Sequence, residues 1–256
     1  DSTTGYVDTS ASFDGAYGAS IPCLGDCGVD SNSVMIWRLS HQQGQLQPPT
    51  MLKAPSLPGS QMTSIQFSPT ENKLAATTDD GHLLLWDLDK PDQPEINQGF
   101  TADLVKPLFT TNGNQLLIGV HSTVELWQIT DNELVLVKHF YDPSVEASTA
   151  EITHLALSVN GERALSTDDD GRITLWDMET GEALATFPSQ NPRINAIAFS
   201  EDGSNAIYTD SRGSVYSLQL SETDSAIVMW TENNRLPLFS SEDCNHYAFT
   251  DYCPPK

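Results

Sequence analysis

Basic residues are scarce in this sequence. Only 12 Lys and Arg stand against 35 Asp and Glu, which gives a formal net charge of -23. Binding of nucleic acid or of an anionic membrane depends on Lys and Arg, so we expect neither as a partner. A cationic protein, or a multiprotein assembly that presents a cationic surface, fits this charge; acidity that only keeps the protein soluble is the alternative.

Long hydrophobic runs are also missing. The longest resembles "AIVMW" at 226–230, far short of the roughly 20 apolar residues that a membrane-spanning helix needs. No signal peptide is visible in the sequence shown. We therefore expect no direct membrane span, while a lipid anchor outside this piece, as in a lipoprotein, stays open.

Cysteines are few, at positions 23, 27, 244 and 253, which excludes a disulfide scaffold. Cys23 and Cys27 enclose three residues with a central glycine, so a tight loop could bring them to disulfide distance. Reduced thiols or half of a metal site are the alternatives, and the pairing of Cys244 and Cys253 stays open. With no initiator Met and no N-x-S/T sequon, we expect a secreted, periplasmic or cell-surface bacterial protein; the alternative is cytoplasmic.

Enzyme signatures are absent as well. The sequence contains no G-x-S-x-G, no phosphate-cradling glycine loop, no H-E-x-x-H and no C-x-x-C. The six histidines are scattered without ligand spacing, and His82 and His121 fall at or beside turns, where we expect a structural or solvated role. We predict no catalytic residue, no cofactor and no bound metal.

A repeated turn and strand dominates what is present. "TTDDGHLLLWDL" (77–88) matches "STDDDGRITLWDM" (166–178) almost residue for residue, and weaker copies stand at 29–39, 119–129 and 209–220. The fifth position after the turn glycine or its substitute recurs every 41 to 49 residues, as Trp37, Trp86, Trp127, Trp176 and Leu218. Repeats of this length indicate a propeller.

Further strands surround each copy. Upstream segments alternate around Asn-Gly or Asp-Gly turns, which is a hairpin pattern; they lie at 63–78, 104–119, 152–167 and 194–209, with similar segments at 7–21 and 236–250. Segments such as 133–140 and 183–189 suit a fourth strand. Four short strands per unit of 40 to 45 residues is the period of a propeller blade.

The chain thus resembles the WD-repeat family, through Trp86-Asp87 and Trp176-Asp177 with their preceding Asp-Gly turns. The resemblance implies an all-β fold, a β-propeller of four-stranded antiparallel blades. About six blades are visible, or seven in the full protein, within a single domain over 1–256 whose first and last blades are incomplete. The usual Gly-His pair before a blade's first strand is missing, which puts the family's network of His, turn Asp and Trp in doubt.

A propeller gathers the turns between second and third strands on one face. We expect Asp80 and Asp170 to cap backbone N–H groups there and to let Gly81 and Gly171 take φ > 0. These residues, with Trp86 and Trp176, are assigned to the fold. The other turn aspartates have no such task, so we predict that they form a partner-binding face: Asp26, Asp30, Asp79, Asp168, Asp169 and Asp210.

The functional expectation is a non-enzymatic scaffold for protein–protein interaction. Its binding surface would be this acidic face, together with inter-blade loops such as 141–151 and the long turn at 21–33, because loops longer than a fold needs are where binding tends to reside. The alternative is a propeller enzyme, either a metal-dependent hydrolase or a quinone-cofactor dehydrogenase.

Overall fold

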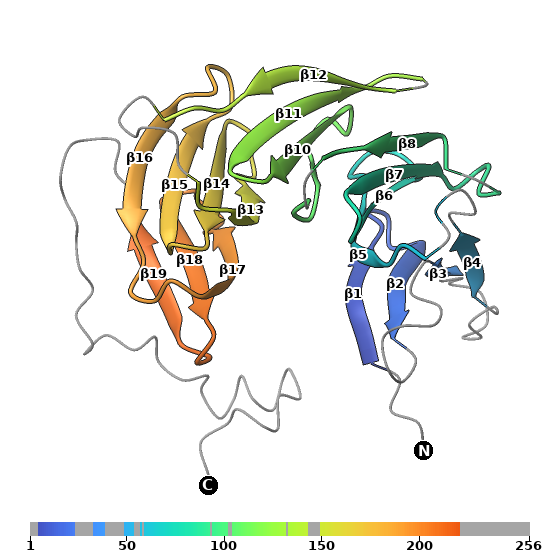
Figure 1. The fold of residues 1–256 in the computed structure, drawn as a ribbon, viewed down its shortest axis with the longest axis horizontal. Helices are drawn as coiled ribbons and strands as arrows, with labels where there is room; N and C mark the ends of the chain where they lie inside the picture. The colour runs from blue at the N-terminus through green and yellow to red at the C-terminus, as the bar shows by residue number, and fades with distance from the viewer. Residues whose placement is uncertain are drawn as a thin grey trace, which may run out of the picture.

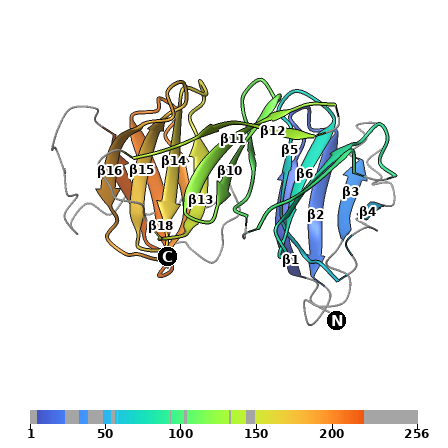
Figure 2. The same ribbon diagram turned by 45° about the horizontal axis from the view of Figure 1, so that its top comes forward.

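The structure, a computed structural model, describes residues 5–23, 33–38, 49–53, 57, 59–92, 94–101, 104–131, 133–142 and 149–220. Within these ranges every regular element is a β-strand, and the strands form five antiparallel sheets (Figures 1 and 2). In each sheet the strands follow one another in chain order, as in a propeller blade. The all-β propeller predicted from the repeats is confirmed.

Each sheet is called a blade and numbered along the chain. Blade 1 contains β1 (Gly5–Ala11), β2 (Tyr17–Cys23), β3 (Ser33–Arg38) and β4 (Thr50–Lys53), and blade 2 contains β5 (Met62–Phe67), β6 (Lys73–Thr78), β7 (His82–Asp87) and β8 (Ile96–Gly99). Blade 3 contains β9 (Leu108–Phe109), β10 (Gln115–Val120), β11 (Thr123–Ile129) and β12 (Leu134–His139). Blade 4 contains β13 (Ile152–Leu157), β14 (Arg163–Asp168), β15 (Arg172–Asp177) and β16 (Ala183–Pro188), and blade 5 contains β17 (Ile194–Phe199), β18 (Asn205–Asp210) and β19 (Val215–Gln219).

The five blades stand side by side along an open arc, with blade 1 at one end and blade 5 at the other (Figure 1). The first strand of each blade lies on the inner side of the arc: β1 packs against β5, and β13 packs against β17. The repeat predicted at 236–250, and the sixth blade that it would begin, lie outside the described residues.

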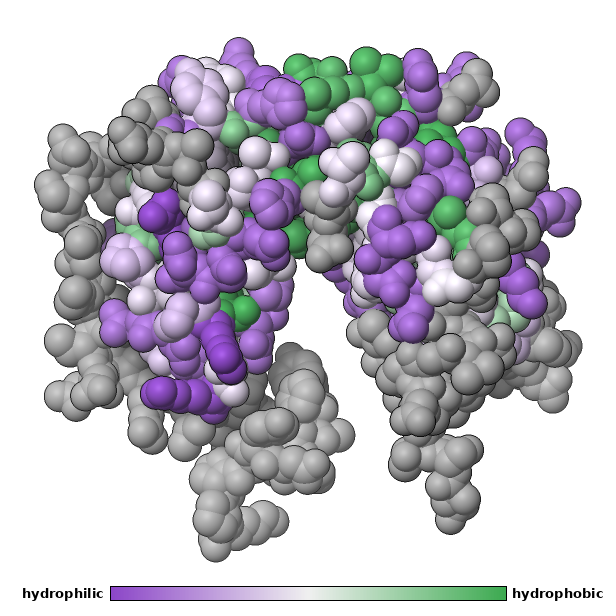
Figure 3. Space-filling model, viewed as in Figure 1, coloured by the Kyte–Doolittle hydropathy of each residue, from purple (hydrophilic) through white to green (hydrophobic). Residues whose placement is uncertain are grey.

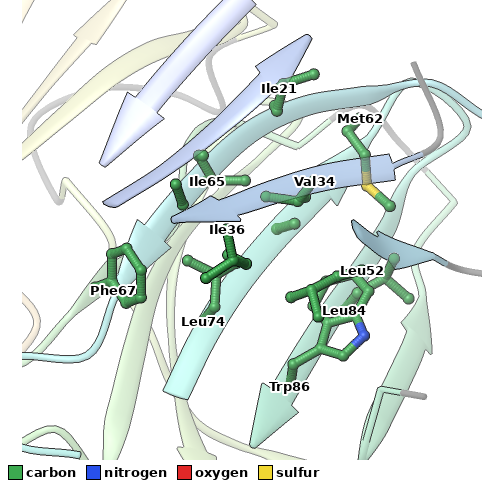
Figure 4. Close-up of a cluster of buried hydrophobic side chains, with 12 residues drawn as sticks. Ile21, Val34, Ile36, Leu52, Met62, Ile65, Phe67, Leu74, Leu84 and Trp86 are labelled. Atoms are coloured by element: carbon green, nitrogen blue, oxygen red, sulfur yellow. The ribbon is translucent and has the colours of Figure 1, made fainter. Parts of the chain in front are cut away.

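The core lies between the blades. Middle strands are apolar on both faces because a neighbouring blade covers each face; Leu83, Leu84, Leu85 and Trp86 in β7 are all fully buried. One cluster joins blades 1 and 2, where Val34 and Ile36 meet Leu74 and Trp86 (Figure 4). Similar clusters join blades 2 and 3, 3 and 4, and 4 and 5.

The predicted Asn-Gly and Asp-Gly turns are confirmed, and they share one hydrogen-bond pattern. In the turn between β13 and β14, Ser158 Oγ donates to Asn160 Oδ1 at 2.8 Å, and Arg163 N–H donates back to Ser158 Oγ at 2.9 Å. Gly161 follows with φ = 74°, a conformation that glycine adopts without steric cost. The sequence pattern Ser/Thr-x-Asx-Gly recurs in four blades, and in each the hydroxyl donates to the Asx side chain, at residues 12–15, 110–113, 158–161 and 200–203.

The repeated tryptophans differ in their hydrogen bonds. Trp176 Nε1 donates to Ser166 Oγ and Trp127 Nε1 to Glu125 Oε2, each at 2.9 Å. Trp86 Nε1 is buried with no hydrogen-bond acceptor among the described residues, and Ala76 occupies the position in blade 2 that Ser166 holds in blade 4. Neither bond involves a histidine or a turn aspartate. Trp127 and Trp176 therefore do not form the network of His, turn Asp and Trp that is usual in the family.

One ion pair links blades that are not neighbours. Lys106, just before β9, places Nζ 3.0 and 2.8 Å from the two carboxylate oxygens of Asp8 on β1. The same carboxylate accepts a hydrogen bond of 2.9 Å from Ile65 N–H on β5. A single side chain on blade 1 thus holds blades 2 and 3 together on the inner side of the arc.

Candidate functional site

The aspartate-rich turns of blades 2 and 4 form the candidate site. Gly81 and Gly171 have φ of 81° and 79°, so the expectation that these glycines take positive φ is confirmed. Each glycine N–H closes its turn by donating to the carbonyl oxygen three residues earlier, that of Thr78 or Asp168. The turns therefore present their neighbouring side chains from a fixed backbone.

Asp79 and Asp169 clamp the start of each blade's first strand. Asp79 Oδ1 accepts a hydrogen bond of 2.7 Å from Gln61 N–H, and Asp79 N–H donates to the Gln61 carbonyl oxygen at 2.9 Å. Asp169 makes the same pair of bonds with Glu151, at 2.9 and 3.0 Å. The interpretation that these two aspartates have no structural task was wrong, yet both remain exposed and keep a second carboxylate oxygen.

Asp168 and Asp210 are buried, with 7% and 1% of their surface exposed. Asp168 Oδ1 accepts from Arg172 N–H at 2.8 Å, and Asp210 Oδ1 accepts from Arg212 N–H and Ser214 N–H at 2.9 Å each. Asp168 is thus the turn cap of blade 4, a role that had been assigned to Asp170, and Asp210 is the turn cap of blade 5. The assignment of the caps to Asp80 and Asp170 was wrong, because in blade 2 the cap is Thr78. Such burial leaves both carboxylates poorly placed to contact a partner.

In blades 2 and 4 the residue that caps the turn comes directly before the aspartate that binds the start of the first strand. In blade 2 it is Thr78, whose Oγ1 accepts from His82 N–H at 2.9 Å, in the same i to i+4 pattern as Asp168 and Arg172. A comparison of the two sequences by residue identity aligns the aspartates next to the glycine. It does not reveal that Thr78 and Asp168 have the same role. The signal that could have found it is a hydroxyl or carboxylate acceptor three residues before each turn glycine.

Substitution of Asp168 tests the cost of its burial. Burial raises the pKa of the Asp168 carboxyl above its ordinary value, despite the bond from Arg172 N–H. A raised pKa in the folded protein means that the charge costs stability at neutral pH, and that this cost vanishes as pH falls through the raised pKa toward 3.8. Asp168→Asn keeps the Oδ1 acceptor without the charge and is therefore expected to raise the free energy of unfolding at pH 7.

The measurement is urea unfolding of both proteins between pH 7 and 4. The advantage of Asp168→Asn should shrink as pH falls. Asp168→Ala, which loses the acceptor as well as the charge, serves as control and should be less stable than Asp168→Asn at every pH. An Asn variant less stable than wild type at pH 7 would show that the ionised carboxylate stabilises the turn.

Asp80 and Asp170 complete the exposed part of the site. Asp80 accepts hydrogen bonds from Ser60 Oγ at 2.6 Å and Thr78 Oγ1 at 2.5 Å, which lower its pKa below the ordinary value and keep it charged at neutral pH. Asp170 is exposed beside its glycine. The term acidic rim is used below for four exposed carboxylates in the blade 2 and blade 4 turns: Asp79, Asp80, Asp169 and Asp170.

The turns of blades 3 and 5 do not extend this charge. In blade 3, His121 turns the chain with φ = 53°, is well exposed, and lies 3.4 Å through Nδ1 from a carboxylate oxygen of Glu151. The solvated role expected for His121 is confirmed. In blade 5, Arg193 and Arg212 are exposed near the equivalent turn, so the face that was predicted to be acidic also carries positive charge at that end.

The inner side of the arc carries a hollow of about 300 Å³. Its lining comes from the first strands of blades 2 to 5 and consists of Gln66, Leu108, Phe109, Leu155, Ala156, Leu157 and Ile197. The side chains of these residues are apolar apart from that of Gln66. Within the residues whose side chains are described, no three His, Cys, Asp or Glu side chains lie close enough together to hold a metal ion.

Some predicted residues cannot be placed. Asp26, Asp30 and Cys27 lie outside the described residues, and so does the side chain of Cys23 at the end of β2. Their roles in partner binding and in a disulfide stay predictions. In the described ranges, no helix has the length and apolar character needed to cross a membrane.

Two family models match the sequence. The Vps8 beta-propeller model matches residues 105–242, which is more than half of the chain, and the model of the WD domain, G-beta repeat, matches residues 52–87. The second match includes β5, β6 and β7 up to Asp87. It therefore contains the turn and strand that begin at residue 77, which the first match does not reach. The resemblance drawn from Trp86 and Trp176 is confirmed.

Similar proteins are WD-repeat relatives from several eukaryotes. The serine-threonine kinase receptor-associated protein of Gallus gallus is 22% identical over 55% of this chain and 49% of its own length. A guanine nucleotide-binding protein subunit beta of Oryza sativa subsp. japonica is 27% identical over 60% of this chain and 43% of its own. Target of rapamycin complex subunit wat1 of Schizosaccharomyces pombe is 26% identical over 61% and 48%. The chain thus spans less than half the length of each of these relatives.

Proposed function

The chain belongs to the Vps8 beta-propeller family, and on that premise we propose that it is a non-enzymatic scaffold that binds a partner protein through the acidic rim. The observation that carries the proposal is the exposure of these four carboxylates on two hydrogen-bonded turns. Each belongs to a turn closed by a glycine of positive φ, and two of them are fixed by bonds to the backbone of the first strand. A partner therefore meets preformed charges and need not order them.

The sign of the rim indicates the chemistry of the partner. Carboxylates fixed on a protein with a formal net charge of -23 attract a cationic surface over long range and raise its association rate. Arginine suits such a site best, because its guanidinium group matches a carboxylate in a bidentate manner. We therefore propose a partner with an Arg- or Lys-rich surface.

The names of the relatives support a role in assemblies. One is named as the beta subunit of a guanine nucleotide-binding protein, and another as a subunit of a target of rapamycin complex. A third is named as associated with a kinase receptor. By analogy with these names, we propose that this chain works as one member of a multiprotein complex.

Charge neutralisation of the rim tests the proposal. The variant Asp79→Asn, Asp80→Asn, Asp169→Asn, Asp170→Asn removes four negative charges while each side chain keeps an oxygen acceptor for the clamps. Proteins captured by the wild type from a native extract should be lost, and the association rate of a purified captured partner should fall about tenfold or more at low salt. Quantitative mass spectrometry and surface plasmon resonance measure these two effects.

The matched control removes the same charge from the opposite ends of the blades. Glu71, Glu162, Glu179 and Glu201 are exposed in turns at that end, and their replacement by Gln should leave capture unchanged. Equal capture by the rim variant and the wild type would place the binding surface elsewhere. A stoichiometric metal or a bound chromophore in the purified protein would instead favour the propeller enzyme.

We also propose, from the sequence alone, an extracytoplasmic location with Cys23 and Cys27 joined by a disulfide. Free-thiol titration of the purified, unreduced protein tests this expectation. Fewer than four free thiols are expected, whereas four would favour the cytoplasmic alternative.

A further inference from the structure

The outer edge of blade 3 is an exposed apolar strand. The sheet order is β12-β11-β10-β9, so among the described strands β12 pairs only with β11, and no described strand covers its other edge. Val135, Leu136 and Val137 are 43%, 36% and 49% exposed, while Leu134 before them is buried. Figure 3 shows the resulting hydrophobic patch along the top of the molecule, over β12.

Both faces of this strand are apolar near the edge. Leu136 pairs across the ladder with Trp127, which packs in the core shared with blade 2, and Val135 pairs with Gln128 on the opposite face. The register shifts by one residue between Lys138 and Leu136, so Val137 is the bulged residue. A bulge leaves its residue outside the regular ladder, and here that residue is a further exposed valine.

The described outer strands of the other blades carry features that protect edges. Strand β4 is four residues long and ends in Lys53, β8 is also four residues long, and β16 ends in Pro188. Short length, lysine, proline and β-bulges are means by which proteins keep edge strands from pairing with other chains. Strand β12 has a bulge, as does β16, but it is longer than β4 and β8 and has no proline.

The one lysine of β12 does not guard this edge. Lys138 Nζ donates to the carbonyl oxygens of Met178, at 3.1 Å, and Glu179, both in the turn that follows β15 in blade 4. The chain after β12 is tied to the same turn, since Tyr141 N–H donates to the Gly181 carbonyl oxygen at 3.0 Å. The strand is thus held in place in advance, which lowers the entropic cost of binding to it.

The open groups define the occupant. An edge strand offers backbone N–H and C=O groups at strand spacing, which only another extended strand can pair in series. Asp131 and Glu133 are exposed just before β12 and favour a basic residue in that strand. A second copy of this chain is disfavoured, because each copy has a net charge of -23.

We propose that β12 is a second interaction surface, which binds an extended segment of another protein by β-strand addition. The segment is rich in β-branched residues on both faces and carries Arg or Lys opposite Glu133. This surface lies on the outer edge of blade 3, whereas the acidic rim lies on turns of blades 2 and 4, so either can fail without the other.

Selection from a random library of displayed twelve-residue peptides tests this proposal. Peptides are selected on the full chain and counter-selected on the variant Val135→Lys, Val137→Lys. The expected peptides are rich in β-branched residues at consecutive positions and include a basic one, and they bind the variant at least tenfold more weakly in fluorescence anisotropy. Amide hydrogen exchange with a selected peptide should show new protection in residues 134–137.

The matched control is Met51→Lys, Leu184→Lys, which adds the same charge at exposed apolar positions on β4 and β16 and should bind the peptides like wild type. Circular dichroism confirms that both variants fold. The proposal is overturned if no peptide survives counter-selection, or if the peptides leave residues 134–137 unprotected. A dimer in light scattering that the β12 variant abolishes would also overturn it, since the occupant would then be a second copy.

Discussion

Gly171→Ala is expected to lower the free energy of unfolding by about 3 kcal/mol. Two costs add. Alanine at φ = 79° pays about 1 to 2 kcal/mol for the left-handed conformation. Its Cβ would also lie 2.4 Å from Pro192 Cα and 2.7 Å from Ser189 Oγ, and relief of such overpacking costs about 1 to 3 kcal/mol more.

Gly213→Ala is the control for the conformational cost alone. Gly213 has φ = 78° in the equivalent turn of blade 5, and no atom of the described residues lies within 4 Å of the Cβ position. It should lose only about 1 to 2 kcal/mol. Urea unfolding of the two variants separates the terms; equal losses would mean that the backbone at Pro192 yields without cost.

Asp8→Ala is expected to lower the free energy of unfolding by about 2 to 3 kcal/mol. The substitution removes the counter-ion of Lys106 and the acceptor of Ile65 N–H together. Hydrogen bonds to charged groups contribute about 1.5 to 3 kcal/mol, and a buried donor left without a partner adds a desolvation cost. Thermal and urea unfolding measure the loss.

Two further variants separate the parts of this link. Asp8→Asn keeps an acceptor for Ile65 N–H and should lose less than Asp8→Ala. Lys106→Met removes the ion pair across blades 1 and 3, whereas Lys90→Met removes an exposed pair with Asp87, 3.8 Å long and three residues apart in sequence; the latter should cost under about 0.5 kcal/mol. Equal effects of the two lysine variants would reduce the Lys106 pair to an ordinary surface contact.

The strands and turns could be predicted because the repeats encode them locally. Glycine five residues before Trp86 and Trp176 fixes the turn, and a hydroxyl two residues before Asn or Asp fixes the other turn of the hairpin. Both signals act within six residues, so the sequence carries them whole. The propeller followed from their spacing.

The roles of individual aspartates could not be predicted in the same way. Asp168, Asp169 and Asp170 are adjacent in sequence, yet one is a buried cap, one clamps a strand and one is exposed. Each role depends on which backbone N–H the carboxylate can reach, and the partner of Asp169 lies 18 residues earlier, at Glu151. The exposure of β12 could not be predicted for a related reason. An apolar fourth strand has the sequence of a buried strand, and only the structure shows whether a neighbouring blade packs against it.

The arc of blades also has a mechanical consequence. The four described core clusters each join blades adjacent in the chain, so small rotations at successive interfaces add up along the arc. The Asp8–Lys106 pair spans blades 1 to 3 and acts as a brace for that half. Blade 5 contacts blade 4 through their shared core. Arg163 also donates a hydrogen bond to the Gly203 carbonyl oxygen, which links these two adjacent blades. Among the described residues, the Asp8–Lys106 pair therefore resists rotation at two successive interfaces, between blades 1 and 2 and between blades 2 and 3.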